Sequence, residues 1–279
     1  MSNSNSSITV NNNKLSSEFL SDFAPTDIEE VKGIISKHGI KTSYEDPLPR
    51  TVLKENLDLL LPIWFKVINK SLSSGNFDGF KQAIITPLIK DNELDQDNLK
   101  NYCPISNLPF LSKLIERTVL SRLNHHMREL DCEMSNQYGY KPAHNTESLL
   151  IKITNDLLIA SDAKTATVLL LLDLSSAFDT VDKVKLINIL SEEIKITGNA
   201  LNWFKSYLFG RTQKVKIGEN FSDSVVIEFG VPQGSVLSPV LFNIYIFALC
   251  MDILKIWASV LKVLLMIISY MHLLPHTFS

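Results

Sequence analysis

The stretch VLLLLDLSSAFDTV, residues 168–181, decides how we interpret the fold. Its five leading apolar residues do not alternate with polar ones, which is typical of a strand buried on both faces. The run ends at Asp173, and a second carboxylate, Asp179, follows. A charge at the end of a buried strand is costly unless something compensates it, and a bound cation is the usual compensation. The alternative is that both carboxylates cap a helix that begins near Lys183.

A second stretch, FGVPQGSVLSPVLFNIY, follows at residues 229–245. We interpret residues 230–238 as a turn that leads from a strand into a helix. Ser238 is the expected N-cap of that helix, and Pro239 is its expected first residue, because its ring presets a helical φ angle. The presence of this stretch favours the cation over the helix cap as the partner of Asp173.

Other segments show the periodicity of regular structure. Residues 81–90 are predicted to form a short strand with a lysine at each end. Residues 211–217 and 222–229 alternate between apolar and polar side chains, which predicts an antiparallel pair of strands. A helix is expected from about residue 51 to 72. A basic amphipathic helix is expected over residues 113–128, with its apolar residues on the inner side.

In this order the two stretches resemble the reverse transcriptases of non-LTR retrotransposons, of the LINE-like, jockey type. Residues 173–182 resemble the first catalytic motif of that family, and residues 230–243 resemble its primer- and template-positioning motif. The resemblance extends back through residues 101–116 and 138–147, and it covers roughly residues 17–254.

The resemblance implies an α+β fold, with the fingers and a partial palm of a right-hand polymerase. An antiparallel palm sheet packed on helices is expected, and the thumb is expected to be absent. We expect a disordered amino terminus over 1–16, a helical lead-in over 17–80, fingers over 81–165 and palm over 166–254. Residues 255–279 form an apolar tail that does not resemble the family.

The same resemblance assigns the chemistry. Asp173 would be the catalytic carboxylate that binds magnesium ions, and Phe178 would exclude ribonucleotides by filling the space beside the sugar 2′ position. Lys81 and Lys90 are candidates for the triphosphate of the incoming nucleotide, and Gln233 can hydrogen-bond the nucleotide or a template base. The alternative for the two lysines is a pair of solvated strand-end residues.

Template and primer would be positioned by the turn and by basic side chains. Gly230 and Gly234 would permit a close backbone approach to a nucleotide or template base. Arg122 and Arg128 extend the basic row of the 113–128 helix, although such a row is more often a solvated face. The positioning set comprises Gly230, Pro232, Gln233, Gly234, Ser235, Lys113, Arg117 and Lys141.

Composition gives no global sign of a nucleic-acid binder, since the net charge is −3 and the pI is about 6.1. Local patches can still contact phosphate. By resemblance the partners are an RNA template, a DNA primer and deoxynucleoside triphosphates, and no protein partner is predictable. No secretory signal is evident, so an intracellular location in cytoplasm or nucleus is expected.

The three cysteines are too few and too scattered for a zinc site or a disulfide framework. Cys103 stands where the family usually carries arginine. An arginine there would offer phosphate a charged planar fork, whereas a thiol offers neither charge nor fork. We therefore expect weakened nucleotide binding.

Half of the expected metal site is missing. In the family the remaining two carboxylates come from an aromatic-Ala-Asp-Asp hairpin after the helix that begins near Ser238. This chain has no Asp or Glu after Asp252, and residues 263–270 read VLLMIISY where the hairpin belongs. We expect negligible catalytic activity from the chain as it stands.

The genetic code offers an explanation. Read one base earlier, the junction of Met266 and Ile267 must spell GAT, an aspartate codon, and the junction of Leu265 and Met266 can spell GAT as well. The preceding junctions permit Phe-Ala, so the alternative frame permits Phe-Ala-Asp-Asp. We therefore hypothesise a frame change near Lys255.

Three alternatives stay open. The chain could be a non-catalytic remnant that grips RNA, or a pseudogene product with no role. Residues 257–274 are also mostly apolar and about the length that spans a bilayer, but Lys262 and His272 interrupt them, so a membrane anchor is the less favoured interpretation.

Overall fold

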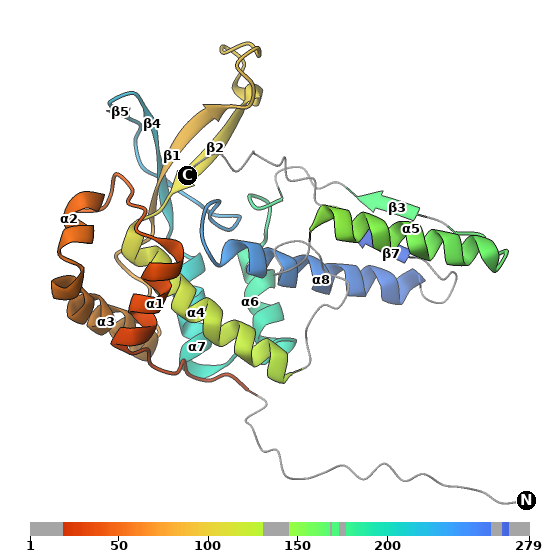
Figure 1. Ribbon diagram of the computed structural model, residues 1–279, viewed down its shortest axis with the longest axis horizontal. Helices are drawn as coiled ribbons and strands as arrows, with labels where there is room; N and C mark the ends of the chain where they lie inside the picture. Colours follow the sequence, from red (N-terminus) through yellow and green to blue (C-terminus); the bar gives the residue numbers. More distant parts are fainter. Residues whose placement is uncertain (1–18, 131–144, 168, 173–176, 258–263, 268–279) are drawn as a thin grey trace, which may run out of the picture.

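The computed structural model describes residues 19–130, 145–167, 169–172, 177–257 and 264–267 (Figure 1). These residues form a mixed fold of helices and strands. In chain order the helices and strands are α1 (Ile28–His38), α2 (Arg50–Glu55), α3 (Leu57–Ser74), β1 (Gln82–Ile89), a 3-10 turn (Leu99–Asn101), β2 (Tyr102–Asn107), α4 (Phe110–Glu129), α5 (Thr146–Asp162), β3 (Leu169–Leu172), α6 (Lys183–Glu192), α7 (Gly198–Leu208), β4 (Thr212–Ile217), β5 (Asn220–Phe221), β6 (Val225–Val226), α8 (Ser238–Trp257) and β7 (Leu264–Ile267).

The single helix expected from residue 51 to 72 is two helices, α2 and α3. Asn56 ends the first, since its φ and ψ of −111° and 27° leave the helical region and its side-chain amide donates to the Val52 carbonyl at 2.9 Å. Local side-chain bonding of this kind competes with the helical hydrogen-bond ladder. The chain therefore bends between α2 and α3.

An aromatic cluster joins α3 and α7 in the centre of the helical core. The rings of Trp203 and Tyr207 stack at 5.4 Å, and Phe77 meets both rings edge-on at 5.2 and 5.1 Å. The Trp203 indole nitrogen donates to the Ser71 hydroxyl at 3.0 Å, so the one polar atom of this buried ring is satisfied. Such packing fixes how the two helices cross.

The larger sheet combines strands from the predicted fingers and palm ranges. β1 pairs antiparallel with β2 and parallel with β4, placing Gln82 beside Thr212. The antiparallel pair expected over residues 211–229 is confirmed, because β4 pairs with both β5 and β6. Figure 1 shows these strands rising from one side of the helical core.

The pairing of β3, which forms a two-stranded sheet with β7, differs from the expected pairing. An antiparallel palm sheet was predicted around it, but β3 pairs in parallel with β7, with Leu172 opposite Ile267. A parallel pair needs a long crossover, and the chain from α6 to α8 supplies one. Both strands are uniformly apolar in sequence, and Leu169 at the start of β3 is exposed.

None of the helices in the described part of the chain is both long and apolar enough to cross a membrane. The segment considered as an anchor, residues 257–274, lies outside the described residues except for Trp257 and β7.

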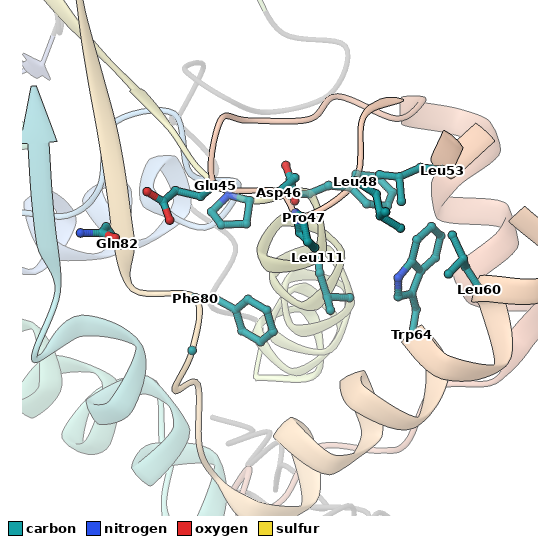
Figure 2. A pocket seen from close by; sticks show the side chains of 13 residues that line it. Glu45, Asp46, Pro47, Leu48, Leu53, Leu60, Trp64, Phe80, Gln82 and Leu111 are labelled. Carbon is teal, nitrogen blue, oxygen red and sulfur yellow. Dashed lines mark hydrogen bonds between the residues drawn. The ribbon is translucent and has the colours of Figure 1, made fainter. Parts of the chain in front are cut away.

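A mainly apolar pocket of about 270 Å³ lies between the 45–48 loop, α3 and the start of α4 (Figure 2). The Asp46 carboxylate closes one side by accepting a hydrogen bond from the Phe110 amide at 2.9 Å, which caps α4 from a distant segment. None of the predicted site residues lines this pocket.

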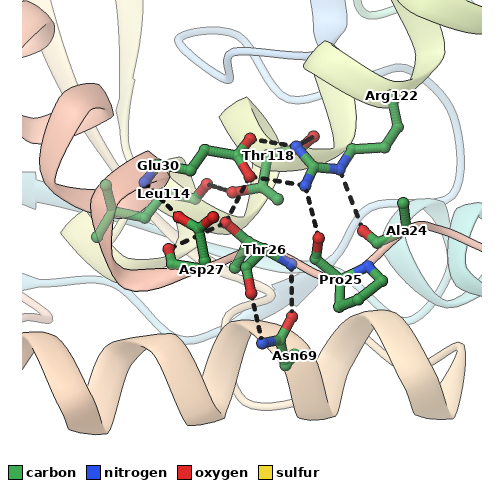
Figure 3. Close-up of polar contacts among 9 residues, drawn as sticks. All are labelled: Ala24, Pro25, Thr26, Asp27, Glu30, Asn69, Leu114, Thr118 and Arg122. Carbon is green, nitrogen blue, oxygen red and sulfur yellow. Dashed lines mark hydrogen bonds and ion pairs between the residues drawn. The ribbon is translucent and has the colours of Figure 1, made fainter.

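Arg122 has a structural role that the sequence interpretation missed (Figure 3). Its guanidinium forms a two-point ion pair with Glu30 of α1, with Nη2 2.7 Å from Oε2. Its Nε and Nη2 also donate to the carbonyls of Ala24 and Pro25, at 3.1 and 3.0 Å. Because all three guanidinium nitrogens form hydrogen bonds, Arg122 holds the amino-terminal segment against α4 and does not follow a template strand.

Replacing Arg122 by alanine should lower the free energy of unfolding by about 2–3 kcal/mol at neutral pH, because a half-buried carboxylate loses its charged partner. The hydrogen bond from Arg122 is the main reason that the pKa of Glu30 lies below its ordinary value. A depressed carboxyl pKa contributes stability above the unfolded-state pKa, and this contribution is lost as the pH falls through the folded-state pKa. Urea titrations of the two proteins should therefore converge on acidification. The exposed Arg128→Ala is the control, and a pH-independent difference would contradict the ion pair.

Candidate functional site

The two stretches that the sequence singled out meet in the structure. The Gly230 amide donates to the Val181 carbonyl, and the Val231 amide donates to the Phe178 carbonyl, both at 2.8 Å. The side-chain amide of Gln233 donates to both oxygens of Asp179, at 3.0 and 3.2 Å. Backbone and side chain together thus fix the 178–181 segment against the turn.

Two predicted site residues lie outside the described residues, Asp173 in 173–176 and Lys141 in 131–144. The described strand β3 ends at Leu172, directly before Asp173. The described chain resumes at Ala177, so residues 178–181 follow the predicted catalytic carboxylate closely in sequence.

The two glycines of the turn approach the protein's own backbone, and their expected close approach to a nucleotide or template base stays a prediction. A Cβ on Gly230 would lie 2.8 Å from Asp179 Cα and from the Phe178 carbonyl oxygen. A Cβ on Gly234 would lie 2.5 Å from the Ser106 carbonyl oxygen of β2. Both φ angles, +86° and +82°, also favour glycine. The turn is therefore pressed against two separate segments of the chain.

The inner side of the turn is polar but buried. Ser235 is only 7 % exposed, and its hydroxyl donates to Glu116 Oε2 at 2.6 Å. The Ser235 hydroxyl oxygen also accepts hydrogen bonds from the amides of Leu237 and Ser238, at 3.1 and 3.2 Å. Ser235 therefore supports the turn from inside the protein, where it is out of reach of a nucleic acid.

The predicted start of α8 is one residue too late, and Ser238 is not its N-cap. Ser238 is the first helical residue, and its hydroxyl donates backwards to the Pro232 carbonyl at 2.8 Å. The free amide groups at the start of the helix are instead satisfied by Ser235 and by Glu116. The acceptor from α4 comes from far along the chain, so the local pattern of residues could not identify it.

Phe178 is half-buried, and its ring lies 5.0 Å from the ring of Phe242 on α8. One side of the ring is thus supported by the core, as a rigid wall beside a nucleotide would need. Its role in excluding ribonucleotides stays a prediction.

Lys81 and Lys90 flank β1 at opposite ends, so they are roughly 30 Å apart at the usual rise per residue. They cannot both hold one triphosphate. Lys81 forms an ion pair with Asp78 at 2.6 Å, and Lys90 donates to the Lys100 carbonyl at 2.9 Å.

Lys113 and Arg117 are half-buried on α4, and burial lowers the pKa of both side chains. They are not the solvated face that the sequence left as the alternative, whereas Arg128 is exposed. Partly desolvated cations interact strongly with phosphate, so the template role of these two residues stays a prediction.

Residues 89–271 match the family described as reverse transcriptase (RNA-dependent DNA polymerase). This chain belongs to the reverse transcriptase family. The RNA-directed DNA polymerase from the mobile element jockey of Drosophila melanogaster is 30 % identical over 224 residues, which are 78 % of this chain and 24 % of the relative.

Two further relatives from Drosophila melanogaster match a shorter part of this chain. The probable RNA-directed DNA polymerase from transposon BS is 32 % identical over 166 residues, 60 % of this chain and 18 % of the relative. The probable RNA-directed DNA polymerase from transposon X-element is 33 % identical over 168 residues, again 60 % and 18 %. The reverse transcriptase chain thus spans between about a fifth and a quarter of the length of these relatives.

Two buried cations lie in the reverse transcriptase domain, and neither was expected from the sequence. Lys183 is 3 % exposed and donates to the Ile227 carbonyl, and burial, reinforced by the nearby charge of Arg211, lowers its pKa to about 8. Arg211 is 1 % exposed and lies over the Tyr207 ring at 4.8 Å. The Nε and Nη2 atoms of Arg211 have no hydrogen-bond partner within the part of the chain that the structure describes. The Arg211 guanidinium is therefore held by the Tyr207 ring and by the hydrogen bond from its Nη1 to the Tyr207 carbonyl, at 2.8 Å.

No group of three or more metal-ligating side chains occurs among the described residues of this reverse transcriptase. The strand beside β3 is β7, which reads Leu-Leu-Met-Ile and offers no carboxylate. Reverse transcriptases generally use divalent metal ions, and among the described residues the strand paired with β3 adds no carboxylate for a two-metal site.

Proposed function

We propose that this chain is a reverse transcriptase domain of a non-LTR retrotransposon. The parent reaction is the template-directed addition of deoxynucleotides to a DNA 3′ end, with RNA as the template. The observation that carries the proposal is the contact between residues 178–181 and 230–233, which unites the two motifs that the reaction requires.

Within this proposal each part of the site has a role. Asp173 is the metal-binding carboxylate, and Phe178 selects deoxynucleotides. The outer edge of the turn, formed by Gln233 and Gly234, faces the nucleic acid, and Lys113 contacts its phosphates. Arg117 and Lys141 extend that contact along the template. Lys81 and Lys90 act at separate points of β1, so at most one of them reaches the triphosphate.

The chain as it stands is proposed to bind without catalysing. Two-metal catalysis needs carboxylates from more than one strand, and β7 supplies none. In addition, β2 carries the uncharged Cys103 at the position where an arginine would assist nucleotide binding. The strands β1 and β2 and the 230–238 turn, which we assign to holding an RNA–DNA hybrid, do not depend on the missing carboxylates.

Binding to a poly-rA/oligo-dT hybrid tests this function. Affinity should fall by at least about tenfold between roughly 50 and 200 mM salt, because cationic side chains displace the counterions of phosphate. Lys113→Gln should reduce the slope of log K against log salt by about one. Lys185→Gln removes the same charge from an exposed position on α6 and is the matched control. No binding at low salt would contradict the proposal.

A further inference from the structure

Glu116 is a carboxylate in the middle of α4 with no exposed surface. The sequence contains a weak sign of it, since an acid stands on the otherwise apolar inner side of the helix, between Ile115 and Val119. A buried carboxylate is costly unless hydrogen bonds or charges compensate it. The hydrogen-bond partners of Glu116 therefore indicate its structural role.

Most partners of Glu116 belong to the turn. Its Oε2 accepts hydrogen bonds from the Ser235 hydroxyl at 2.6 Å, the Val236 amide at 2.7 Å and the Leu237 amide at 3.3 Å. Its Oε1 accepts from the Ser112 hydroxyl on α4 at 2.8 Å. The two amides lie at the start of α8, where the helix dipole also favours a negative charge.

A second helix, α7, also contacts Ser235 of the turn. The Tyr207 hydroxyl of α7 lies within hydrogen-bond distance of the Ser235 hydroxyl. Burial raises the pKa of Tyr207 above its ordinary range, so its hydroxyl keeps the proton. Since Ser235 gives its own proton to Glu116, Tyr207 is the donor to Ser235. The turn is thus held from inside by α4 and α7 together.

The other side of the turn is open. Gly234 is exposed and Gln233 is half-exposed, whereas Pro232 and Ser235 on either side of them are buried. Anchoring at Ser235, Val236 and Leu237 therefore fixes where the two open residues stand. A carboxylate that makes three bonds within three consecutive residues restrains their backbone more than one bond could.

We propose that Glu116 is a positioning residue, which holds the 230–238 turn so that Gln233 and Gly234 meet the RNA–DNA hybrid at a fixed place. This inference rests on the proposed function. Glu116 does not itself touch the nucleic acid, because it is buried behind the turn.

The test measures binding of the full chain to the poly-rA/oligo-dT hybrid at low salt, together with amide hydrogen exchange at Val236 and Leu237. Glu116→Ala should weaken binding by about tenfold and speed exchange at both amides, since a charge-assisted hydrogen-bond set is lost. Glu116→Gln keeps an oxygen toward the turn and should bind nearly as the unsubstituted chain does. Ser235→Ala removes one anchor and should weaken binding by a smaller factor, with the fold least disturbed.

Glu129→Ala is the matched control, because it removes the same charge from an exposed position on the same helix. Loss of a carboxylate by itself should tighten binding to phosphate slightly, so weaker binding by Glu116→Ala has the opposite sign to the charge effect. Equal affinities of the unsubstituted chain, Glu116→Ala and Ser235→Ala would overturn the inference and leave the proposed function intact. If Glu116→Ala does not fold, the Ser235→Ala result decides in the same way. Absence of binding by the unsubstituted chain would overturn the proposed function itself, and the inference with it.

Discussion

Primer extension on poly-rA with an oligo-dT primer should stay at background for the chain as it stands, and should rise by roughly a thousandfold or more once the reading frame after Lys255 is corrected. Metal ions contribute several kcal/mol of transition-state stabilisation, and each 1.36 kcal/mol is about tenfold in rate. The alternative frame requires an aspartate codon at the junction of Met266 and Ile267 and permits a second at the junction of Leu265 and Met266. In the structure these residues lie on β7, where Ile267 is opposite Leu172, the residue before Asp173.

The corrected chain is made by inserting one base near the Lys255 codon of the encoding DNA. Asp173→Asn in the corrected chain is the control, and it should return extension to background because it removes the metal-binding carboxylate that the first motif supplies. Strong extension by the uncorrected chain would show that the metal ligands lie elsewhere. An encoding DNA without GAT-GAT across Leu265 to Ile267 would exclude the frame change.

Gly230→Ala should lower the free energy of unfolding by about 3–5 kcal/mol, through steric overlap and a left-handed backbone. The added Cβ would meet backbone atoms of Phe178 and Asp179 at 2.8 Å, and backbone yields less readily than a side-chain end. Relief of the overlap would push the turn away from residues 178–181 and break the bond from the Gly230 amide to Val181. Urea unfolding monitored by tryptophan fluorescence measures the change.

Gly33→Ala is the matched control for Gly230→Ala. Gly33 lies in the middle of α1, where a Cβ would meet nothing within 4 Å. Alanine at such a position is expected to stabilise by about 0.5–1 kcal/mol. A loss of less than about 1 kcal/mol for Gly230→Ala would mean that the turn does not press on the 178–181 segment.

Local periodicity predicted several elements correctly. The strand at 81–90 is β1, the basic amphipathic helix is α4 and the alternating residues after 211 form the β4 pairs. These elements depend on residues that are near neighbours in the chain, so their spacing alone identifies them. The break at Asn56 was missed because it depends on a side-chain bond within one turn.

The residues misjudged from sequence are those whose partners lie far along the chain. Arg122 pairs with Glu30, Gly234 meets Ser106 and Ser235 bonds Glu116. A row of basic residues looks the same whether its cations face phosphate, water or a distant carboxylate. Nothing in the spacing of residues 113–128 distinguishes Arg122 from Arg128.

By itself the sequence determined the family, the order of the two motifs and the absence of an acid after Asp252, because these are properties of which residues follow one another. Only the tertiary structure decided that residues 178–181 support the turn, that Glu116 holds it from behind and that Leu-Leu-Met-Ile stands beside the strand that leads to Asp173. Hydrogen bonds and close packing between distant segments form only when the chain has folded, so no local pattern of residues specifies them.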